Sequence, residues 1–309
     1  MTSERLRLLL ASAGYRAPEA AASAQSFADG SRYRIEIPSV EGPAVLEAVL
    51  EEAETRRVPV RRVSQGSGVM MLSDDEIRAM AKLGCSARIE VSLFLGPRGA
   101  WEPGGQAFLT AAAGGSARGL DGLAWCVAEA RRATELGIRS LLVADVGALA
   151  LLGELRAAGE LPTNLVLKTS VLLPVANPAT ARSLERLGAG TINVSTDLSV
   201  AQLAEVRGAV SAPLDVYIEA PDDQGGFVRF YEVADIVRAA APVYIKLGVR
   251  NAPNIYPVGA HLSSTAQSLG RERVRRAELC LRLMAELDPD LVEDRDATEV
   301  PDDLAVPET

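Results

Sequence analysis

Eight short apolar runs rich in β-branched residues recur along the chain, and a segment with helical periodicity follows each run. The runs span 32–39, 59–65, 88–94, 140–146, 165–171, 191–196, 214–220 and 243–249. Strands that alternate with helices pair in parallel, because each crossover needs a helix to bring the chain back. Eight such units in about 250 residues match the size of a closed (β/α)₈ barrel. The sequence therefore predicts a single α/β domain, a TIM barrel.

Segments outside the repeat flank this barrel, which accounts for residues 30–287. Residues 1–29 are predicted to form an N-terminal helix over 2–14 and an alanine-rich connector. The tail, residues 288–309, is acidic, contains prolines and is poor in aromatic residues, which is typical of disorder. Within the barrel, Ser73 and Glu76 have the spacing of a helix capping box, and Asn177-Pro178 is a helix start.

Composition excludes several classes of protein. The formal charge of −9 and pI near 4.9 argue against a nucleic-acid or anionic-membrane binder. The sequence has no long uncharged apolar run, so we expect no membrane span. Three well-separated cysteines, Cys85, Cys126 and Cys280, fit reduced thiols and a cytoplasmic protein. A hydrophobic content of 48% with only 4% aromatics predicts a core built from Val, Leu, Ile and Ala, as the strand layers of a barrel usually are.

In a barrel of this kind the chemistry gathers on the loops that follow the strands. The second, third, seventh and eighth of these loops are predicted to supply the ligand contacts. Gln65 and Ser67 lie in a glycine turn whose backbone N–H groups can approach an anion, although such turns are also common flexible connectors. Arg98 lies in the long third loop, residues 95–119, and is a second candidate for substrate binding.

Lys168 and Lys246 fall inside the fifth and eighth predicted strands. A desolvated lysine has a lowered pKa and is suited to imine formation or proton transfer. The alternative is a structural ion pair with an internal carboxylate such as Glu90, Glu219 or Asp145. We take Lys168, Lys246 and Asp145 as candidate catalytic residues at the mouth.

Three carboxylates cluster where the seventh strand ends. Glu219 closes the strand, and Asp222 and Asp223 follow in the loop. Such a group is able to share a proton, bind a divalent metal or hold a substrate amine, while its structural alternative is to cap the next helix. We take Glu219 as a catalytic candidate and all three as candidate metal ligands.

The loop after the eighth strand is polar and stiffened by prolines. Arg250 is suited to bidentate binding of a carboxylate or phosphate, and Asn251 and Tyr256 add hydrogen-bonding groups. His261, the only histidine, follows in the same loop. A histidine there can act as acid, base or metal ligand, and its alternative is a structural role.

The stretch 142–220 resembles the central part of the U32 peptidase family of collagenase-like barrel proteins. The parallels are Asp145-Val146-Gly147, Lys168-Thr169-Ser170, Asn177, Leu187-Gly188 and Asp197-Leu198-Ser199. The resemblance implies a barrel that cleaves an amide or peptide bond, and we take Asn193 and Asp197 as substrate-binding. The chain departs from the family in having Asp197 where Glu is usual and no cysteine set after the seventh strand. We therefore expect no iron–sulfur cluster.

Three functions compete on this evidence. The first is a hydrolase similar to U32 peptidases, with carboxylates that position water and Lys246 or Arg250 beside the oxyanion. The second is a lyase or isomerase of a small carboxylated metabolite that uses a barrel lysine. The third is a non-catalytic partner-binding subunit. We favour the first, with a peptide or small-molecule substrate, no haem or flavin, and a divalent metal and a homo-oligomer left open.

Overall fold

The computed structural model describes residues 5, 8, 11–12, 22–96, 115–291 and 301–309. Eight short strands form one sheet within these residues. They are β1 (Tyr33–Pro38), β2 (Val60–Ser64), β3 (Glu90–Phe94), β4 (Ser140–Val143), β5 (Val166–Thr169), β6 (Ile192–Asn193), β7 (Leu214–Glu219) and β8 (Val243–Leu247). Each lies inside a run that the sequence predicts as a strand.

The sheet closes on itself. The strands pair in parallel in the order β5-β4-β3-β2-β1-β8-β7-β6. At the open edge, Lys168 of β5 forms a parallel bridge with Thr191, the residue before β6. Backbone hydrogen bonds from Gly190 N to Leu167 O (2.8 Å) and from Thr169 N to Thr191 O (3.0 Å) complete the ring. The predicted (β/α)₈ barrel is confirmed.

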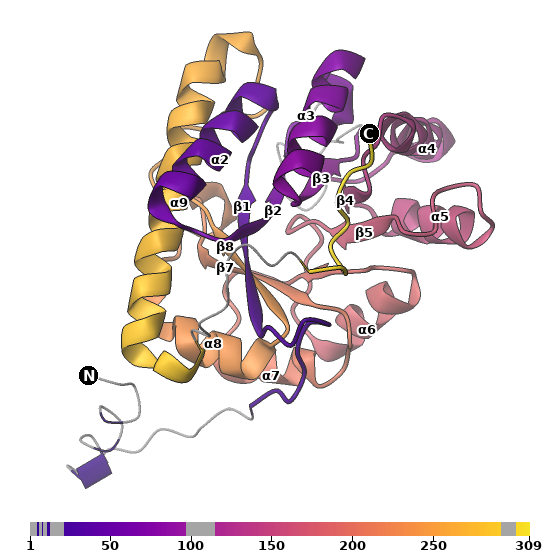
Figure 1. The fold of residues 1–309 in the computed structure, drawn as a ribbon. Coiled ribbons are helices and arrows are strands. Elements are labelled where there is room, and N and C mark those ends of the chain that lie inside the picture. The colour runs from indigo at the N-terminus through magenta and orange to yellow at the C-terminus, as the bar shows by residue number, and fades with distance from the viewer. Residues whose placement is uncertain (1–4, 6–7, 9–10, 13–21, 97–114, 292–300) are drawn as a thin grey trace.

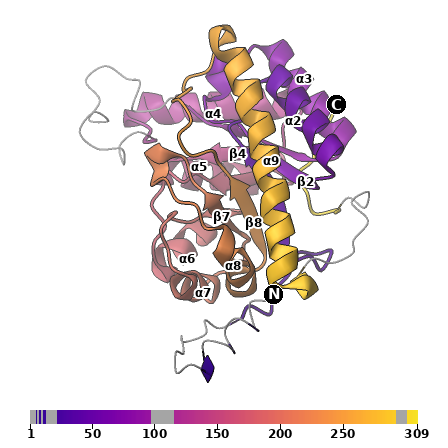
Figure 2. The same cartoon turned by 90° about the vertical axis from the view of Figure 1, so that its left-hand side faces the viewer.

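The helices surround this ring in chain order (Figure 1). They are α2 (Pro43–Arg56), α3 (Asp74–Ala87), α4 (Gly119–Glu135), α5 (Val146–Ala157), α6 (Pro178–Arg186), α7 (Val200–Arg207), α8 (Val233–Ala240) and α9 (Ser263–Leu287). Local signals start several of them. Ser73 and Glu76 form the predicted capping box of α3, and the Asn177 side chain caps α6 ahead of Pro178. Figure 2 shows α9 along the length of the molecule, beside α2 and α8.

The helix α9 begins inside the polar segment that follows the eighth strand. Its first residue is Ser263, because Ala266 and Gly270 are buried in the same stripe as Val274 and Ala277. A Cβ on Gly270 would lie 3.0 Å from Val49 of α2, so the glycine allows the two helices to approach closely. Packing against α2 therefore stabilises the first turns of α9 as helix, although their polar sequence is typical of a loop.

The apolar core lies between the strands and the helices. Side chains such as Ile35, Val63, Leu141 and Ile245 are fully buried there against helical residues. The alternate positions of each strand point to the barrel axis, since successive strand side chains face opposite sides. The predicted core of Val, Leu, Ile and Ala is confirmed between the strands and the helices, whereas much of the barrel interior is polar or charged. The inward residues include Glu36, Arg62, Ser64, Glu90, Ser92, Ser140, Lys168, Asn193, Asp215 and Lys246.

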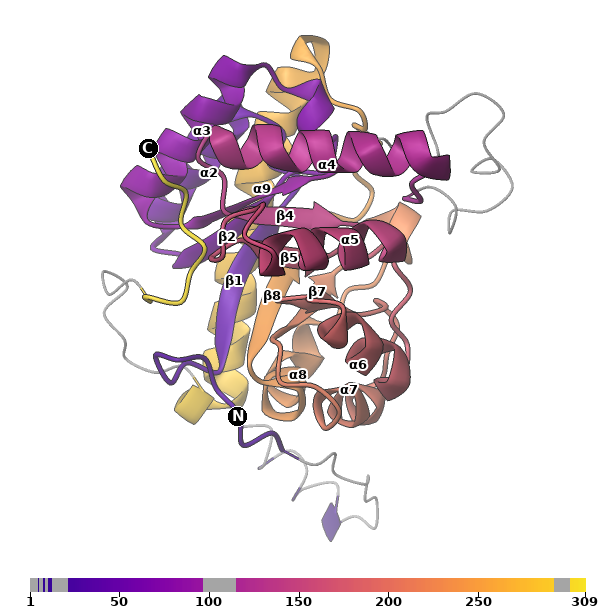
Figure 3. The same cartoon turned by 90° about the vertical axis from the view of Figure 1, so that its right-hand side faces the viewer.

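The C-terminal tail also differs from expectation. Residues Pro289–Leu291 form a short 3₁₀ helix, and residues 301–309 pack against the barrel near α3 (Figures 1 and 3). Leu304 and Ala305 are buried, and Asp303 forms a 2.5 Å ion pair with Arg34. Glu308 donates its backbone N–H to Gly137 O at 2.9 Å. The prediction of disorder is wrong for residues 301–309, because their acidic side chains meet arginines and their apolar ones find a surface.

Two expectations concern residues that the structure largely leaves undescribed. Most of the predicted N-terminal helix, 2–14, and most of the long loop 95–119, including Arg98, lie outside the described residues. In the part of the chain that is described, no helix is long and apolar enough to cross a membrane.

Candidate functional site

The barrel interior holds a cluster of opposite charges contributed by five strands, β1, β2, β3, β5 and β7. Glu36 of β1 accepts hydrogen bonds from Arg62 Nε (2.8 Å) and Lys168 Nζ (3.0 Å) at the same oxygen, Oε2. Asp215 of β7 accepts from both Arg62 and Lys168. Glu90 Oε1 lies 3.7 Å from Arg62 Nη1. All five side chains are at most 2% exposed, so each charge depends on the others for stabilisation.

These contacts shift the pKa values within the cluster in opposite directions. Burial raises the pKa of Glu90, and Arg62 offsets only part of that effect. Burial would also raise the pKa of Glu36, but Arg62 and the two lysines hold it well below its usual range. Burial lowers the pKa of Lys168 to about 8, and the positive charge of Arg62 acts in the same direction. Glu36 is therefore the firmly ionised hub, and Lys168 is a lysine that loses its proton around pH 8, well below the usual range for a lysine.

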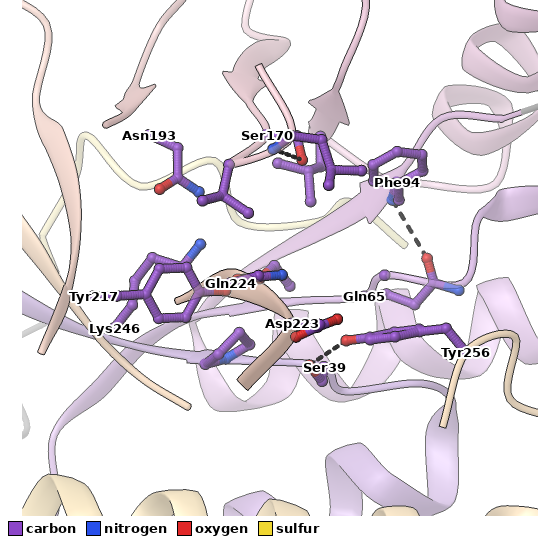
Figure 4. A pocket seen from close by; sticks show the side chains of 16 residues that line it. Ser39, Gln65, Phe94, Ser170, Asn193, Tyr217, Asp223, Gln224, Lys246 and Tyr256 are labelled. Carbon is purple, nitrogen blue, oxygen red and sulfur yellow. Dashed lines mark hydrogen bonds between the residues drawn. The ribbon is translucent and has the colours of Figure 1, made fainter. Parts of the chain in front are cut away.

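A small pocket lies above this cluster, at the carboxyl ends of the strands (Figure 4). It encloses about 520 Å³ and opens to solvent. Its polar or aromatic lining comes from strand ends and from the loops after β7 and β8. These side chains are Ser39, Ser64, Gln65, Phe94, Ser170, Asn193, Tyr217, Asp223, Gln224, Lys246 and Tyr256. The pocket thus lies at the mouth, where the barrel fold predicts a site.

Lys246 is the barrel lysine that lines this pocket. Its Nζ lies 3.5 Å from Glu36 Oε1 and 4.3 Å from the centroid of the Tyr217 ring. The Asn193 amide has one orientation in which both its oxygen and its nitrogen have hydrogen-bond partners. In that orientation the amide oxygen accepts a hydrogen bond from Lys246 Nζ at 2.8 Å. In that orientation the Asn193 nitrogen donates to Asp215 O at 3.2 Å. Glu36, Tyr217 and Asn193 therefore hold the amine at the boundary between the charged cluster and the pocket.

The opposite wall is built from the loops after β1, β2 and β8. Ser39 has a φ of 60°, and its hydroxyl forms a hydrogen bond with the Tyr256 hydroxyl. Gly66 allows this arrangement, because a Cβ there would lie 2.7 Å from Tyr256 Cε1. Figure 4 shows Ser39, Asp223 and Tyr256 on one side and Ser170 and Asn193 across from them.

The glycine turn after β2 does bind an anion with its backbone, but the anion belongs to the protein. Gly66 N and Ser67 N donate to the two carboxylate oxygens of Glu41 at 2.7 and 2.8 Å. Gly68 N donates to Gln65 Oε1 at 3.0 Å, and Ser67 Oγ accepts from Val258 N at 2.9 Å. These N–H groups hold the loops together and already have partners, so they leave no donors for a substrate.

The five catalytic candidates separate in space. Lys246 lines the pocket, while Lys168 lies in the buried cluster beneath it. Asp145 accepts from Ala148 N at 2.8 Å and so caps α5. Glu219 accepts from Arg250 N at 2.9 Å and lies 3.5 Å from Arg276 of α9, because the β7–β8 register shifts between Tyr217 and Glu219. His261 is exposed and lines neither this pocket nor the hollow beside it.

The candidates for substrate binding also divide. Gln65, Asn193 and Tyr256 line the pocket. Ser67 is buried behind it, and Asp197 is exposed outside it. Arg250 and Asn251 are exposed and both bind Asp222. The pocket lining therefore contains three of these seven described candidates.

The three candidate metal ligands do not converge. Glu219 is turned to α9, Asp222 pairs with Arg250 at 3.1 Å, and Asp223 lines the pocket. Among the described residues, no group of three or more His, Cys, Asp or Glu side chains is placed to hold a metal ion. The expected three-carboxylate set is thus not formed.

Several lining residues have no distinctive signal in the sequence. Ser39, Ser170 and Tyr217 follow or end strands, and the alternation along each strand would assign them to the interior. Arg273 of α9 borders a hollow beside the pocket, although it lies in a helix. The signal for Arg273 is its place in the buried stripe formed by Ala266, Gly270 and Ala277, where an apolar residue is usual.

The fold and the pocket together define a (β/α)₈-barrel protein with a small polar pocket at the strand carboxyl ends. No protein-family model matches the chain, and no curated protein matches it either. The chain resembles a solved protein from Coccidioides immitis that is assigned as a fructose-1,6-biphosphate aldolase. The identity is 14%, the TM-score is 0.52, and the match covers 84% of this chain and 92% of that one.

Two further solved structures extend the comparison. A U32 peptidase is 18% identical with a TM-score of 0.41, over 67% of this chain and 74% of its own. A truncated 3-deoxy-D-arabino-heptulosonate 7-phosphate synthase from Thermotoga maritima is 14% identical with a TM-score of 0.46, over 87% and 93%. At 14% identity, the likeness to the Coccidioides immitis protein shows the fold alone and leaves the reaction open.

Proposed function

We propose that the chain is a barrel enzyme in which Lys246 forms an imine with the carbonyl group of a small substrate, as lyases and isomerases of this kind do. One observation carries the proposal. The amine of Lys246, on a side chain 2% exposed, reaches the floor of a small polar pocket at the catalytic end of a barrel.

The surroundings of Lys246 support amine chemistry. A lysine attacks a carbonyl carbon through its Nζ nitrogen. Lys246 is buried, and its Nζ lies 3.5 Å from Glu36 Oε1 at the boundary of the pocket. The attack forms a C–N bond, and loss of one water gives the imine.

The pocket also offers neutral hydrogen-bond donors for the oxygen atoms of a substrate. Burial raises the pKa of both Tyr217 and Tyr256, so each phenol keeps its proton. Ser170 adds a hydroxyl at the end of β5. The small size of the pocket favours a metabolite over a peptide.

Borohydride trapping tests the proposal sharply, because the chain has three lysines, Lys82, Lys168 and Lys246. The protein is incubated with a panel of 2-oxo acids and aldehydes, reduced, and digested for mass spectrometry. We expect one substrate to leave a reduced adduct on the Lys246 peptide, with no adduct in Lys246→Met.

Lys82→Met is the matched control, since Lys82 is exposed on α3 and should be dispensable. Adducts confined to Lys82 or the terminal amine, or no adduct with any carbonyl compound, would contradict imine chemistry at Lys246.

Hydrolysis of an amide bond is the second candidate, as the resemblance of residues 142–220 to U32 peptidases implies. The observation in its favour is Asp223, a carboxylate that lines the pocket and is able to position water. Release of amines from a peptide library that is lost in Asp223→Asn, with no borohydride adduct, would favour this reaction over imine formation.

A further inference from the structure

Arg273 is a buried cation with few partners. Its side chain is 5% exposed on the inner face of α9. Its Nη1 donates to Ser39 O at 3.5 Å, the longest distance that still counts as a hydrogen bond, and its Nε has no hydrogen-bond partner. No ion pair joins Arg273 to a carboxylate within the residues that the structure describes. Glu41 and Glu219 act on the guanidinium only through space, so Arg273 lacks the direct ion pair that usually accompanies a buried charge.

The empty space beside Arg273 adjoins the pocket of Lys246. Arg273 lines a hollow of about 680 Å³ under the loop after β8. This hollow and the pocket share five lining residues: Pro38, Ser39, Tyr217, Asp223 and Tyr256. The two spaces therefore adjoin across one wall, with Lys246 bordering one and Arg273 bordering the other.

We propose that Arg273 binds the carboxylate group of the substrate whose carbonyl group reaches Lys246. This inference rests on the proposed function and adds the substrate class, a small oxo acid. A carboxylate would give the guanidinium the charge-assisted hydrogen bonds that the protein does not supply. Asp222 and Asp223 also line the hollow and repel a phosphate dianion more strongly than a carboxylate.

Arg250 is less suited to this role. Its side chain is 53% exposed and already forms an ion pair with Asp222. Water screens an ion pair at such a position, whereas a carboxylate bound to Arg273 would lie in a drier environment. A lyase of a carboxylated metabolite needs an anion-binding residue. We therefore assign that role to Arg273 of α9 and not to Arg250 of the loop after β8.

Ligand-induced thermal stabilisation tests the assignment independently of imine chemistry. The full chain is titrated with succinate, 2-oxoglutarate and inorganic phosphate, and the apparent Kd is taken from the shift in Tm. The variants are Arg273→Met, Lys246→Met and Arg275→Met. Arg275 is an exposed arginine of the same helix and serves as the matched control.

We expect the carboxylates to raise the Tm of the wild type, Arg275→Met and Lys246→Met. In Arg273→Met their binding should weaken by about 10- to 100-fold, the cost of losing a charge-assisted hydrogen-bond pair. Without ligand, Arg273→Met should be at least as stable as the wild type, because it removes a buried charge that has no direct ion pair. A purely structural arginine would instead give a lower Tm in that variant.

Equal stabilisation of the wild type and Arg273→Met by carboxylates would overturn the inference, and so would the absence of any shift in the wild type. Stabilisation by phosphate alone would overturn the carboxylate assignment. Carboxylate binding that depends on Arg273 without any borohydride adduct would refute imine formation and leave the Arg273 site standing. The two proposals thus fail separately.

Discussion

Two lysines inside one barrel have different environments because they lie at different heights. Lys246 is in register with Glu36 on one side and Tyr217 on the other, near the strand ends that border the pocket. Lys168 is joined to Glu36 and Asp215 and is fully buried. The same residue type thus serves as a candidate reactive group in one strand and as a structural cation in another.

The lowered pKa of Lys168 gives stability a defined pH dependence. Between about 8 and the ordinary value of 10.5, the unfolded chain holds a proton on Lys168 that the folded protein has released. The free energy of unfolding therefore rises with pH across this window, by up to about 3 kcal/mol from this group.

Lys168→Met removes that titration. At pH 7 it should lower the free energy of unfolding by about 3–5 kcal/mol, since Glu36 and Asp215 lose a buried partner. Urea unfolding at a series of pH values should show the gap between wild type and variant widening above pH 8. A gap that narrows with pH would mean that the folded protein raises the pKa of Lys168.

At the scale of elements, polar loop residues often serve the helices and turns and not the site. Glu41 occupies the N–H groups of the turn after β2, and Asp145 binds the first turn of α5. Asp145 also accepts from Ala117 N at 3.2 Å, which ties the start of α5 to the segment before α4.

Asp145 is therefore expected to affect stability and not ligand binding. Asp145→Ala should lower the free energy of unfolding by about 1–2 kcal/mol, the usual cost of removing an N-cap, and Asp145→Asn should recover most of it. Urea unfolding measures the free energy of unfolding, and the carboxylate-induced shift in Tm measures ligand binding. Loss of that shift in Asp145→Asn would return Asp145 to the list of site residues.

At the scale of the whole molecule, the last residues of the chain fasten the end of the barrel that faces away from the pocket. Asp303 pairs with Arg34 of β1, and Glu308 pairs with Arg139, the residue before β4. Pro307 contacts α3, where a Cβ on Gly84 would lie 3.1 Å from it. These contacts join segments that are far apart in the sequence.

Deletion of residues 301–309 should therefore destabilise the barrel. Loss of buried Leu304 and of the smaller contacts is expected to cost about 2 kcal/mol, which corresponds to a drop in Tm of roughly 4–8 °C. Differential scanning calorimetry measures the change.

Gly137→Ala can be combined with that deletion in a double-mutant cycle, because a Cβ on residue 137 would overlap Glu308 O. Its φ of +97° also strains any Cβ, so part of its cost should remain in the shortened chain. Equal costs of Gly137→Ala in the full and shortened chains would show that the tail does not contact this site.

The sequence by itself determined the barrel and many of its helix starts. The alternation of β-branched runs with helical periodicity acts within each unit, and so do the Ser73 capping box and the Asn177-Pro178 start. Such signals are local, because propensity and capping depend on residues a few positions apart. Lys246 could be predicted as a site residue for a related reason. A side chain of a barrel strand faces either the apolar helices or the barrel interior, and a lysine is suited only to the second.

Only the tertiary structure decided which polar side chains meet. A register shift turns Glu219 to α9, close packing with α2 lengthens α9, and Arg273 reaches the hollow from a helix. The docking of residues 301–309 depends on Arg34 and Arg139, which lie far away in the sequence. Partners of this kind are set by strand register and by packing between distant segments, and the residue types along the chain do not encode either one locally.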